Sequence, residues 1–219
     1  MLKTTLTVAV AGMMLVAACS TGDSKTGKSE PAMETDQAVM MAEIGRSAPD
    51  FTLTSSTGNT HSLSDFAGKY VVLEWVNYDC PFVKKHYGSG NMQNLQAAYT
   101  EKDVVWLSIC SSAPGKQGYS EGQALNKRIN QEKSRATAYL VDSDGKVGRM
   151  YGAKTTPHMY VINPEGRLVY AGAIDSKPST NQADIPGATN YVMTALDAAM
   201  VGKTIQTSTT ESYGCSVKY

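Results

Sequence analysis

The residue with the clearest chemical potential in this sequence is a lone cysteine between two predicted elements. Cys80 lies in the stretch EWVNYDCPFVKKHYG (74–88), where a strongly apolar run gives way to a helix that begins at Pro81. Proline suits the first turn of a helix, because the N–H group that it lacks has no partner there. The free N–H groups and the dipole at a helix N-terminus favour an anion. The sequence therefore predicts a reactive thiolate at Cys80.

The charged residues around Cys80 act on its pKa in opposite directions. Lys84, Lys85 and His86 follow it and bring positive charge that favours the thiolate, although lysines at such positions often extend into water. Asp79 precedes it directly, and its negative charge opposes ionisation. We expect the helix N-terminus and the basic residues to prevail, so that the pKa of Cys80 lies below that of a free thiol. A buried, inert thiol is the alternative.

The first residues of the chain have the pattern of an export signal. MLKTTLTVAVAGMMLVAACS carries one basic residue, Lys3, and then an uncharged run that is too short to cross a membrane comfortably but suits a secretory signal. Its end, LVAAC, resembles a bacterial lipobox, in which the cysteine is acylated and becomes the mature N-terminus. We therefore expect a lipoprotein signal peptide at residues 1–18 and a lipid-carrying Cys19. An ordinary signal peptide with an incidental cysteine is the alternative.

The polar segment that starts at Cys19 connects this anchor to the folded part. Residues 19–44 are rich in Ser, Thr, Gly, Lys and Glu without a steady period, which is typical of a flexible tether. Acyl chains on Cys19 would hold the protein on a lipid membrane of the bacterial cell envelope, with its domain facing the periplasm or the outer face. Either the inner or the outer membrane fits this pattern.

The overall composition is that of an ordinary globular protein. The 219 residues are enough for one domain with a core and terminal extensions. Of these residues, 42% are hydrophobic and 18% are charged, and the formal net charge is +0. A neutral chain without blocks of like charge gives no reason to expect a nucleic-acid partner.

The apolar patterns predict one α/β domain over residues 45–204, followed by a polar tail at 205–219 that contains Cys215. Two buried strands flank the helices after Cys80 and form a β-α-β unit, whose strands should be parallel. Hairpins are expected around a Ser-Thr-Gly-Asn turn near the start and an Asn-Pro-Glu-Gly turn near the end. The predicted strands after the first hairpin are 70–76, 104–109, 138–142, 158–162 and 167–172, and the predicted longer helices begin near 81, 91, 120 and 190.

Three stretches of the domain resemble the redoxin branch of the thioredoxin-fold superfamily, which includes the alkyl hydroperoxide reductase/thiol-specific antioxidant family and membrane-tethered thioredoxin-like proteins. They are APDFTL with LSDFAGKYVVLEW, CPFV at the strand-to-helix junction, and YGAKTTPHMYVINPEGRLVYAG. The resemblance covers residues 45–202 and implies a thioredoxin-like α/β fold, with a central mixed β-sheet flanked by helices and an N-terminal β-hairpin. It also implies thiol-dependent oxidoreductase chemistry without a bound cofactor.

The sequence departs from both reactive patterns of this superfamily. Thioredoxins carry C-x-x-C, but Val83 stands at the fourth position. Peroxiredoxins carry P-x-x-x-[TS]-x-x-C, but Leu73 and Asn77 replace the proline and the hydroxyl residue. Asn77 still has an amide that can donate a hydrogen bond to a peroxide or a thiolate. The resemblance therefore leaves peroxide reduction and disulfide reduction both open.

The resemblance also implies roles for residues around Cys80. Glu74 interrupts an apolar strand six residues before Cys80, where thioredoxins carry a buried acid that relays a proton. A partly exposed or salt-bridged strand residue is the alternative for Glu74. Thr156 and Pro157 match the cis-proline loop that lies against the active cysteine and offers its backbone to an extended substrate.

An oxidised Cys80 needs a second thiol, because a sulfenic acid or a mixed disulfide is cleared by one. Cys110 ends the strand expected beside the Cys80 strand, and a place in the core is the favoured interpretation for it. Cys215 lies in the tail YGCSVKY, where mobility would make reach easy. Cys215 is the preferred resolving residue, and Cys110 stays open as an alternative.

The sequence thus predicts a lipid-anchored thiol oxidoreductase of the cell envelope. It would use Cys80 to reduce peroxides or protein disulfides and would take electrons from an external thiol. The alternative is a thioredoxin-fold binding module without turnover, which would hold a peptide at the Pro157 loop, or copper through Cys80 and His86 or His158. No second closely spaced cysteine supports a metal site, and we expect none.

Overall fold

The computed structural model describes residues 41–219. The predicted signal peptide, the lipidation site at Cys19 and the tether up to residue 40 lie outside the described residues. Within residues 41–219, no helix combines the length and the apolar character that crossing a membrane requires.

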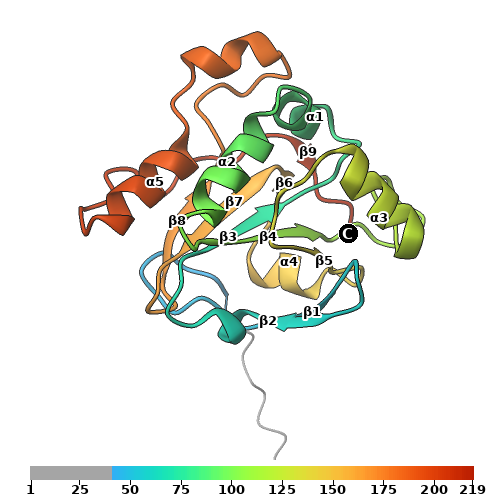
Figure 1. Ribbon diagram of the computed structural model, residues 1–219, viewed down its shortest axis with the longest axis horizontal. Coiled ribbons are helices and arrows are strands. Elements are labelled where there is room, and N and C mark those ends of the chain that lie inside the picture. Colours follow the sequence, from blue (N-terminus) through green and yellow to red (C-terminus); the bar gives the residue numbers. More distant parts are fainter. Residues whose placement is uncertain (1–40) are drawn as a thin grey trace, which may run out of the picture. The chain divides into compact units, whose positions relative to one another are not determined.

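A seven-stranded mixed sheet forms the centre of the fold (Figure 1). Its strand order is β2-β1-β5-β4-β3-β7-β8, with β3, β4 and β5 parallel and the remaining pairs antiparallel. The predicted mixed sheet with an N-terminal hairpin is confirmed. The strands are β1 Thr52–Ser55, β2 Thr60–Ser62, β3 Val71–Trp75, β4 Val105–Cys110, β5 Ala138–Val141, β7 His158–Ile162 and β8 Leu168–Gly172.

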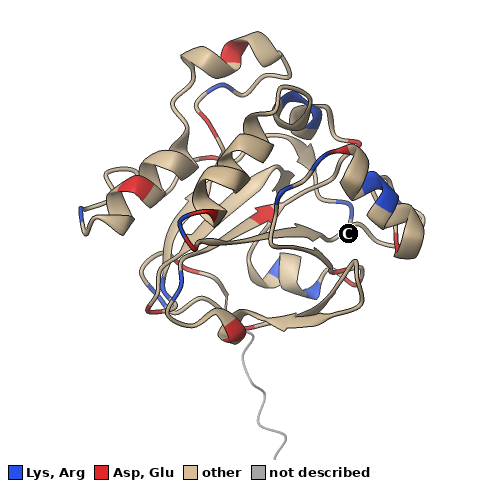
Figure 2. Ribbon diagram, viewed as in Figure 1, with Lys and Arg blue, Asp and Glu red and all other residues tan. Residues whose placement is uncertain are grey.

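Helices cover both faces of this sheet, because successive side chains of its strands point to opposite faces. In β3, Val72 packs in the cluster that contains residues of α1, α2 and α5, whereas Leu73 and Trp75 pack in the cluster that contains residues of α4 and η1. Basic and acidic residue positions are interspersed along the surrounding helices and loops (Figure 2). The helices are η1 Leu63–Phe66, α1 Pro81–Gly88, α2 Asn91–Thr100, α3 Gly122–Gln131, α4 Lys146–Met150, η2 Gln182–Gly187 and α5 Tyr191–Met200.

The C-terminal tail differs from its prediction as a mobile polar segment. It packs against the domain, and its short strand β9 (Cys215–Ser216) pairs antiparallel with another short strand, β6 (Thr155–Thr156). Further back in the tail, Thr209 forms an isolated bridge with Ala171 of β8. Two-residue strands have no sequence period that could be recognised, so the docking of the tail is visible only in the structure.

Candidate active site

Cys80 lies at the start of α1, after the loop that follows β3. It is the N-cap residue, its backbone is extended (φ −69°, ψ 127°), and Pro81 is the first residue of the helix. The Cys80 carbonyl accepts a hydrogen bond from the Lys84 N–H at 2.9 Å, which begins the helical pattern. The side chain of Cys80 is fully buried. The predicted strand-to-helix junction is therefore present, and it shields the thiol from solvent.

The proline loop lies directly against this thiol. The Thr156–Pro157 peptide is cis, as the resemblance implies. Strand β7 pairs with β3 so that His158 is opposite Trp75, which brings the residues just before β7 beside the loop that leads to Cys80. Cys80 Sγ donates a hydrogen bond to the Thr156 carbonyl oxygen at 3.1 Å. The role of Thr156 and Pro157 in substrate binding stays a prediction.

The pairing of β9 with β6 brings a second cysteine to the same place. In its register Cys215 is opposite Thr156, whose carbonyl oxygen lies 3.1 Å from Cys80 Sγ, so the two cysteines meet at the same residue. Both cysteines are free thiols, and Cys215 is half-buried. The structure thus brings together the two cysteines that the sequence analysis preferred as partners. The resolving role of Cys215 stays a prediction.

The two thiols have opposite tendencies to ionise. Burial by itself raises the pKa of Cys80, but the neighbouring donors, chiefly the Cys215 side chain and the Val83 N–H, outweigh it, so that the pKa lies below its ordinary value. Burial and the neighbouring Cys80 sulfur raise the pKa of Cys215 to about 11. At neutral pH Cys215 therefore keeps its proton, and Cys80 is the thiol of the pair that ionises more readily. The role of Cys80 as the nucleophile stays a prediction.

Gly214 allows the tail to approach the proline loop. Its φ is +138°, and a Cβ at this position would lie 2.1 Å from the carbonyl oxygen of Thr156. No side chain fits in that space unless the backbone moves. Sequence reasoning did not identify Gly214, although an aromatic-Gly-Cys triplet in an otherwise polar tail is a signal that the backbone comes close to something there.

Cys110 occupies a different environment at the end of β4. It is 6% exposed, and its Sγ lies 3.6 Å from the carbonyl oxygen of Gly118, to which it donates a weak hydrogen bond. It packs in the cluster that also contains Leu125 and Tyr139. These contacts fit the core interpretation that the sequence analysis favoured for this residue.

Glu74 is a buried carboxylate surrounded by neutral donors. It is 0% exposed and forms no ion pair within the described residues, so the alternative of an exposed or salt-bridged residue is wrong. Burial raises its pKa, and hydrogen bonds to the carboxylate offset only part of that rise. No hydrogen bond joins Glu74 to Cys80, and proton relay stays a prediction. The four donors, at 2.8–3.1 Å, are Tyr87 Oη, Gln96 Nε2, Trp106 Nε1 and Ser108 Oγ.

Asn77 uses its side chain to fix the loop before Cys80. Its Nδ2 donates to the carbonyl oxygen of Gln117 at 3.1 Å, and its Oδ1 accepts from the N–H of Asp79 at 2.9 Å. A Cβ at the neighbouring Gly118 would lie 2.4 Å from the Asn77 side chain, so the two segments are in close contact. The amide that the sequence analysis assigned to a peroxide or thiolate is therefore already engaged with the backbone.

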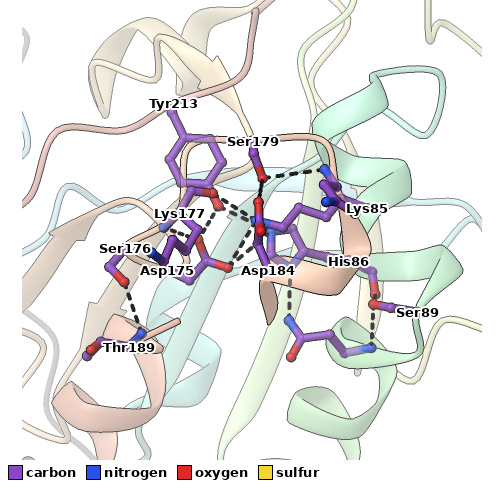
Figure 3. Close-up of polar contacts among 12 residues, drawn as sticks. Lys85, His86, Ser89, Asp175, Ser176, Lys177, Ser179, Asp184, Thr189 and Tyr213 are labelled. Atoms are coloured by element: carbon purple, nitrogen blue, oxygen red, sulfur yellow. Dashed lines mark hydrogen bonds and ion pairs between the residues drawn. The ribbon is translucent and has the colours of Figure 1, made fainter. Parts of the chain in front are cut away.

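The basic residues after Cys80 do not extend toward it as free charges. Lys85 is 1% exposed rather than extended into water, and its Nζ lies 3.3 Å from Asp175 Oδ2 (Figure 3). Burial lowers the pKa of His86 to about 4 despite the opposing charge of Asp175, so His86 is neutral at pH 7. The predicted contribution of His86 to the thiolate is thus wrong, and hydrogen bonding at Cys80 has the larger part.

The histidines of the suggested copper site have other partners. His86 Nε2 lies 3.3 Å from Tyr213 Oη, and His158 Nδ1 lies 3.1 Å from Tyr160 Oη. Between residues 41 and 219 there is no group of three His, Cys, Asp or Glu side chains that could hold a metal ion.

Comparison with known proteins places these features among thiol enzymes. A family model described as AhpC/TSA family matches residues 44–171. The thiol-disulfide oxidoreductase ResA of Bacillus thuringiensis subsp. konkukian is 25% identical over 127 residues, which are 58% of this chain and 68% of that protein. Peroxiredoxin Bcp of Bacillus subtilis is 28% identical, and the match covers 59% of this chain and 84% of that protein.

Solved structures extend the similarity over most of the described fold. An uncharacterized conserved protein from Geobacillus kaustophilus has a TM-score of 0.69 and 27% identity, and the match covers 82% of this chain and 93% of that protein. A hypothetical protein from Sinorhizobium meliloti has a TM-score of 0.68 and 24% identity, and the match covers 81% of this chain and 94% of that protein. The thioredoxin-like fold that the sequence predicts is confirmed.

The lowering of the Cys80 pKa by Cys215 predicts different effects of two substitutions. Cys215→Ala removes the donor and should raise the pKa of Cys80, whereas Cys215→Ser keeps a hydroxyl that can donate and should change this pKa less. The ultraviolet absorbance of the thiolate, followed against pH in the reduced full chain, gives the pKa, with Cys80→Ser as the blank. Equal values for the two variants would show that Cys215 is not the donor.

The surroundings of Glu74 predict a contrast between two further substitutions. Glu74→Gln keeps an acceptor oxygen for most of its donors and should lower the free energy of unfolding by about 1 kcal/mol. Glu74→Ala leaves a cavity and removes the acceptor of Tyr87 Oη, Trp106 Nε1 and Ser108 Oγ, and should lower the free energy of unfolding by about 3–5 kcal/mol. Chemical denaturation measures both, with the exposed Glu101→Gln as control. If Glu74 relays a proton, Glu74→Gln also slows the reaction of Cys80, which its small effect on stability would not explain.

Proposed function

Given that the chain belongs to the AhpC/TSA family and is a thiol oxidoreductase of the thioredoxin type, we propose that Cys80 and Cys215 are its working dithiol. The observation that carries this proposal is the β6–β9 pairing, which places Cys215 opposite Thr156, the residue whose carbonyl oxygen accepts the hydrogen bond of the Cys80 thiol. C-x-x-C enzymes place their second thiol one helical turn after the first, where this chain has Val83. Here a strand from the tail supplies that thiol from the other side.

The reaction runs in two exchange steps. The Cys80 thiolate attacks one sulfur of a substrate disulfide, forms a mixed disulfide and releases the other sulfur as a thiolate. Cys215 then loses its proton and attacks Cys80 Sγ, which forms the Cys80–Cys215 disulfide and releases the second substrate thiolate. The substrate gains two electrons and the protein is oxidised. An external thiol reductant returns the pair to the dithiol.

Disulfide substrates fit the site better than peroxides do. The motif at Cys80 lacks the second cysteine of C-x-x-C, and in this proposal Cys215 takes its place. The motif also lacks the proline and the hydroxyl residue of peroxiredoxins. Asn77, which stands at the hydroxyl position, does not replace that donor, because its amide is hydrogen-bonded to Gln117 and Asp79. Disulfide exchange is therefore the leading candidate.

The β6 edge provides the binding surface for such a substrate. Strand β9 shows that this edge accepts an extended segment whose cysteine lies opposite Thr156 and beside Cys80. A substrate segment would pair with the same backbone groups and contact Pro157 once β9 has moved aside. Recognition of this kind relies on main-chain hydrogen bonds and tolerates different side chains.

Peroxide reduction is the second candidate, favoured by the similarity to a peroxiredoxin and by the lowered pKa of Cys80. The thiolate would attack one peroxide oxygen and break the O–O bond, so that Cys80 becomes a sulfenic acid and the other oxygen takes up a proton and leaves as an alcohol or water. Cys215 would then displace the hydroxyl as water and form the same disulfide. The two candidates thus share the dithiol and differ only in the first step.

Acylated Cys19 would attach the enzyme to a membrane of the cell envelope, with the redox domain on the periplasmic or outer face. In this arrangement residues 19–44 are the tether, 45–204 the redoxin domain and 205–219 the tail that carries Cys215. The lipobox resemblance of LVAAC supports the anchor, and an envelope compartment is one in which disulfide substrates occur.

Trapping experiments on the full chain test the dithiol. With a cysteine-containing peptide disulfide, Cys215→Ala should accumulate a mixed disulfide at Cys80, whereas the wild type should release the peptide thiol and form Cys80–Cys215. Cys110→Ser is the matched control and should behave as the wild type. Mass spectrometry of the non-reduced peptides identifies each species. A Cys80–Cys110 disulfide in the wild type would contradict the proposal, and faster oxidation by hydrogen peroxide than by the peptide would reverse the order of the two candidates.

Loss of the acyl acceptor tests the anchor separately. In a bacterial host the wild-type chain should fractionate with membranes and incorporate a labelled fatty acid, and Cys19→Ser should lose the label. Incorporation of the label by Cys19→Ser would place the lipid elsewhere. Cys215→Ser is the control, since its loss should leave labelling unchanged.

A further inference from the structure

A buried ion pair lies beside the dithiol, outside the residues that the reaction uses. Lys85 comes from α1, the helix that begins at Cys80, and Asp175 follows β8. Their side chains are nearly inaccessible, with Lys85 Nζ 3.3 Å from Asp175 Oδ2. Lys85 Nζ also donates to the carbonyl oxygen of Lys177 at 2.8 Å. Buried charges of this kind need further hydrogen bonds, because desolvation otherwise costs more than the attraction returns.

The tail supplies one of these hydrogen bonds. Tyr213 Oη donates to Asp175 Oδ1 at 2.5 Å, and it also lies 3.3 Å from His86 Nε2 (Figure 3). The ring of Tyr213 packs edge-on against Phe82 at a centroid distance of 5.8 Å, and Lys85 Nζ lies 5.6 Å from its centre. A single side chain of the tail therefore contacts both the ion pair and the first turns of α1.

The positions of these contacts along the chain connect them to the dithiol. Tyr213 precedes Cys215 by two residues, and Lys85 follows Cys80 by five residues on one helix. Between the two tail residues, Gly214 passes so close to the Thr156 carbonyl that the backbone has no freedom to shift inward. The ion pair therefore holds the tail against the same helix from which the Cys80 thiol is presented.

We propose that Tyr213 is a positioning residue that holds Cys215 in register with Cys80, a role that rests on the proposed function of these cysteines as the working dithiol. A hydrogen bond to a buried carboxylate is directional, whereas apolar packing alone would allow the tail to slide. Fixing the register raises the effective concentration of the Cys215 thiol at Cys80, and this concentration sets how readily the intramolecular disulfide closes.

Other contacts keep the tail attached when this hydrogen bond is lost. Beyond Cys215, the Val217 N–H donates to the Lys154 carbonyl at 3.0 Å and Tyr219 Oη donates to the Ala153 carbonyl at 2.8 Å. Before it, Thr210 Oγ1 lies 2.7 Å from Tyr170 Oη. Removing the Tyr213 hydroxyl should therefore loosen the register without releasing the whole tail, which separates positioning from folding.

The equilibrium of the disulfide with glutathione tests the proposal. Oxidised glutathione and the Cys80/Cys215 dithiol give the Cys80–Cys215 disulfide and two molecules of reduced glutathione, and the equilibrium constant reports the effective concentration. In the full chain, Tyr213→Phe keeps the ring on Phe82 and should lower this constant by about 10- to 100-fold, as expected for a lost hydrogen bond to a charged group. The same variant should raise the pKa of Cys80, because the donor Cys215 is less well placed.

Tyr191→Phe is the matched control, because Tyr191 lines the same pocket as Asp175 and Tyr213 but its hydroxyl has no hydrogen-bond partner among residues 41–219. It should leave both the constant and the pKa unchanged, and the melting temperature of each reduced variant checks that it is folded. Asp175→Asn keeps the acceptor but removes its charge, and should also lower the constant.

The outcomes separate the two proposals. If the wild type forms no Cys80–Cys215 disulfide at any ratio of oxidised to reduced glutathione, the proposed working dithiol is wrong, and the positioning role of Tyr213 is wrong with it. If the disulfide forms and Tyr213→Phe has the constant of the wild type, the positioning role is overturned while the dithiol stands. An equal fall in Tyr191→Phe would also overturn it. A fall confined to Tyr213→Phe and Asp175→Asn supports it.

Discussion

The pairing of β6 with β9 is the contact on which the candidate site depends. The Thr156 carbonyl oxygen accepts a hydrogen bond from the Cys80 thiol and lies against Gly214. Thr156 is also the residue that pairs with Cys215. Without β9, Cys80 would lie beside a cis-proline loop as a single thiol with no partner nearby. The strand pairing brings a second thiol to an incomplete motif, and it does so through backbone groups whose close approach requires a glycine at position 214.

Two buried carboxylates stabilise the helix that presents Cys80, each in a different way. Glu74 has no positive partner and is hydrogen-bonded only by neutral groups, of which Tyr87 belongs to α1. Asp175 is paired with Lys85 of the same helix and with Tyr213 of the tail. Because an unpaired buried polar group is costly, both clusters restrict α1 to one position on the sheet. The orientation of the thiol is thus controlled by polar contacts beneath and beside the helix.

The sequence predicted the elements whose side chains form long patterns and missed those held by single contacts. Strands β3 and β4 are recognisable from their apolar runs, and their parallel pairing follows from the helices between them. Strands β6 and β9 have two residues each, too few for a period. Cys80 was found from its place before a helix, and Cys215 was preferred because a mobile tail would reach Cys80 easily, whereas the structure has the tail docked.

The errors at the site also have physical causes. Lys85 and His86 have the charge of surface residues, but their burial depends on Asp175, which lies 90 residues from Lys85 along the chain. Asn77 has the donor that a reaction could use, but its partners are backbone groups that no residue type reveals. Neither long-range pairing nor the use of a donor can be read from local spacing.

The order of synthesis adds a consequence to the long separation of the two cysteines. As the chain emerges, Cys80 and Cys110 are both present well before Cys215. Cys110 is then the early competitor for Cys80, and its burial against the Gly118 carbonyl withdraws it once β4 has joined the sheet. Under the proposed dithiol, folding of the sheet would therefore bury Cys110 before the tail brings Cys215 to Cys80.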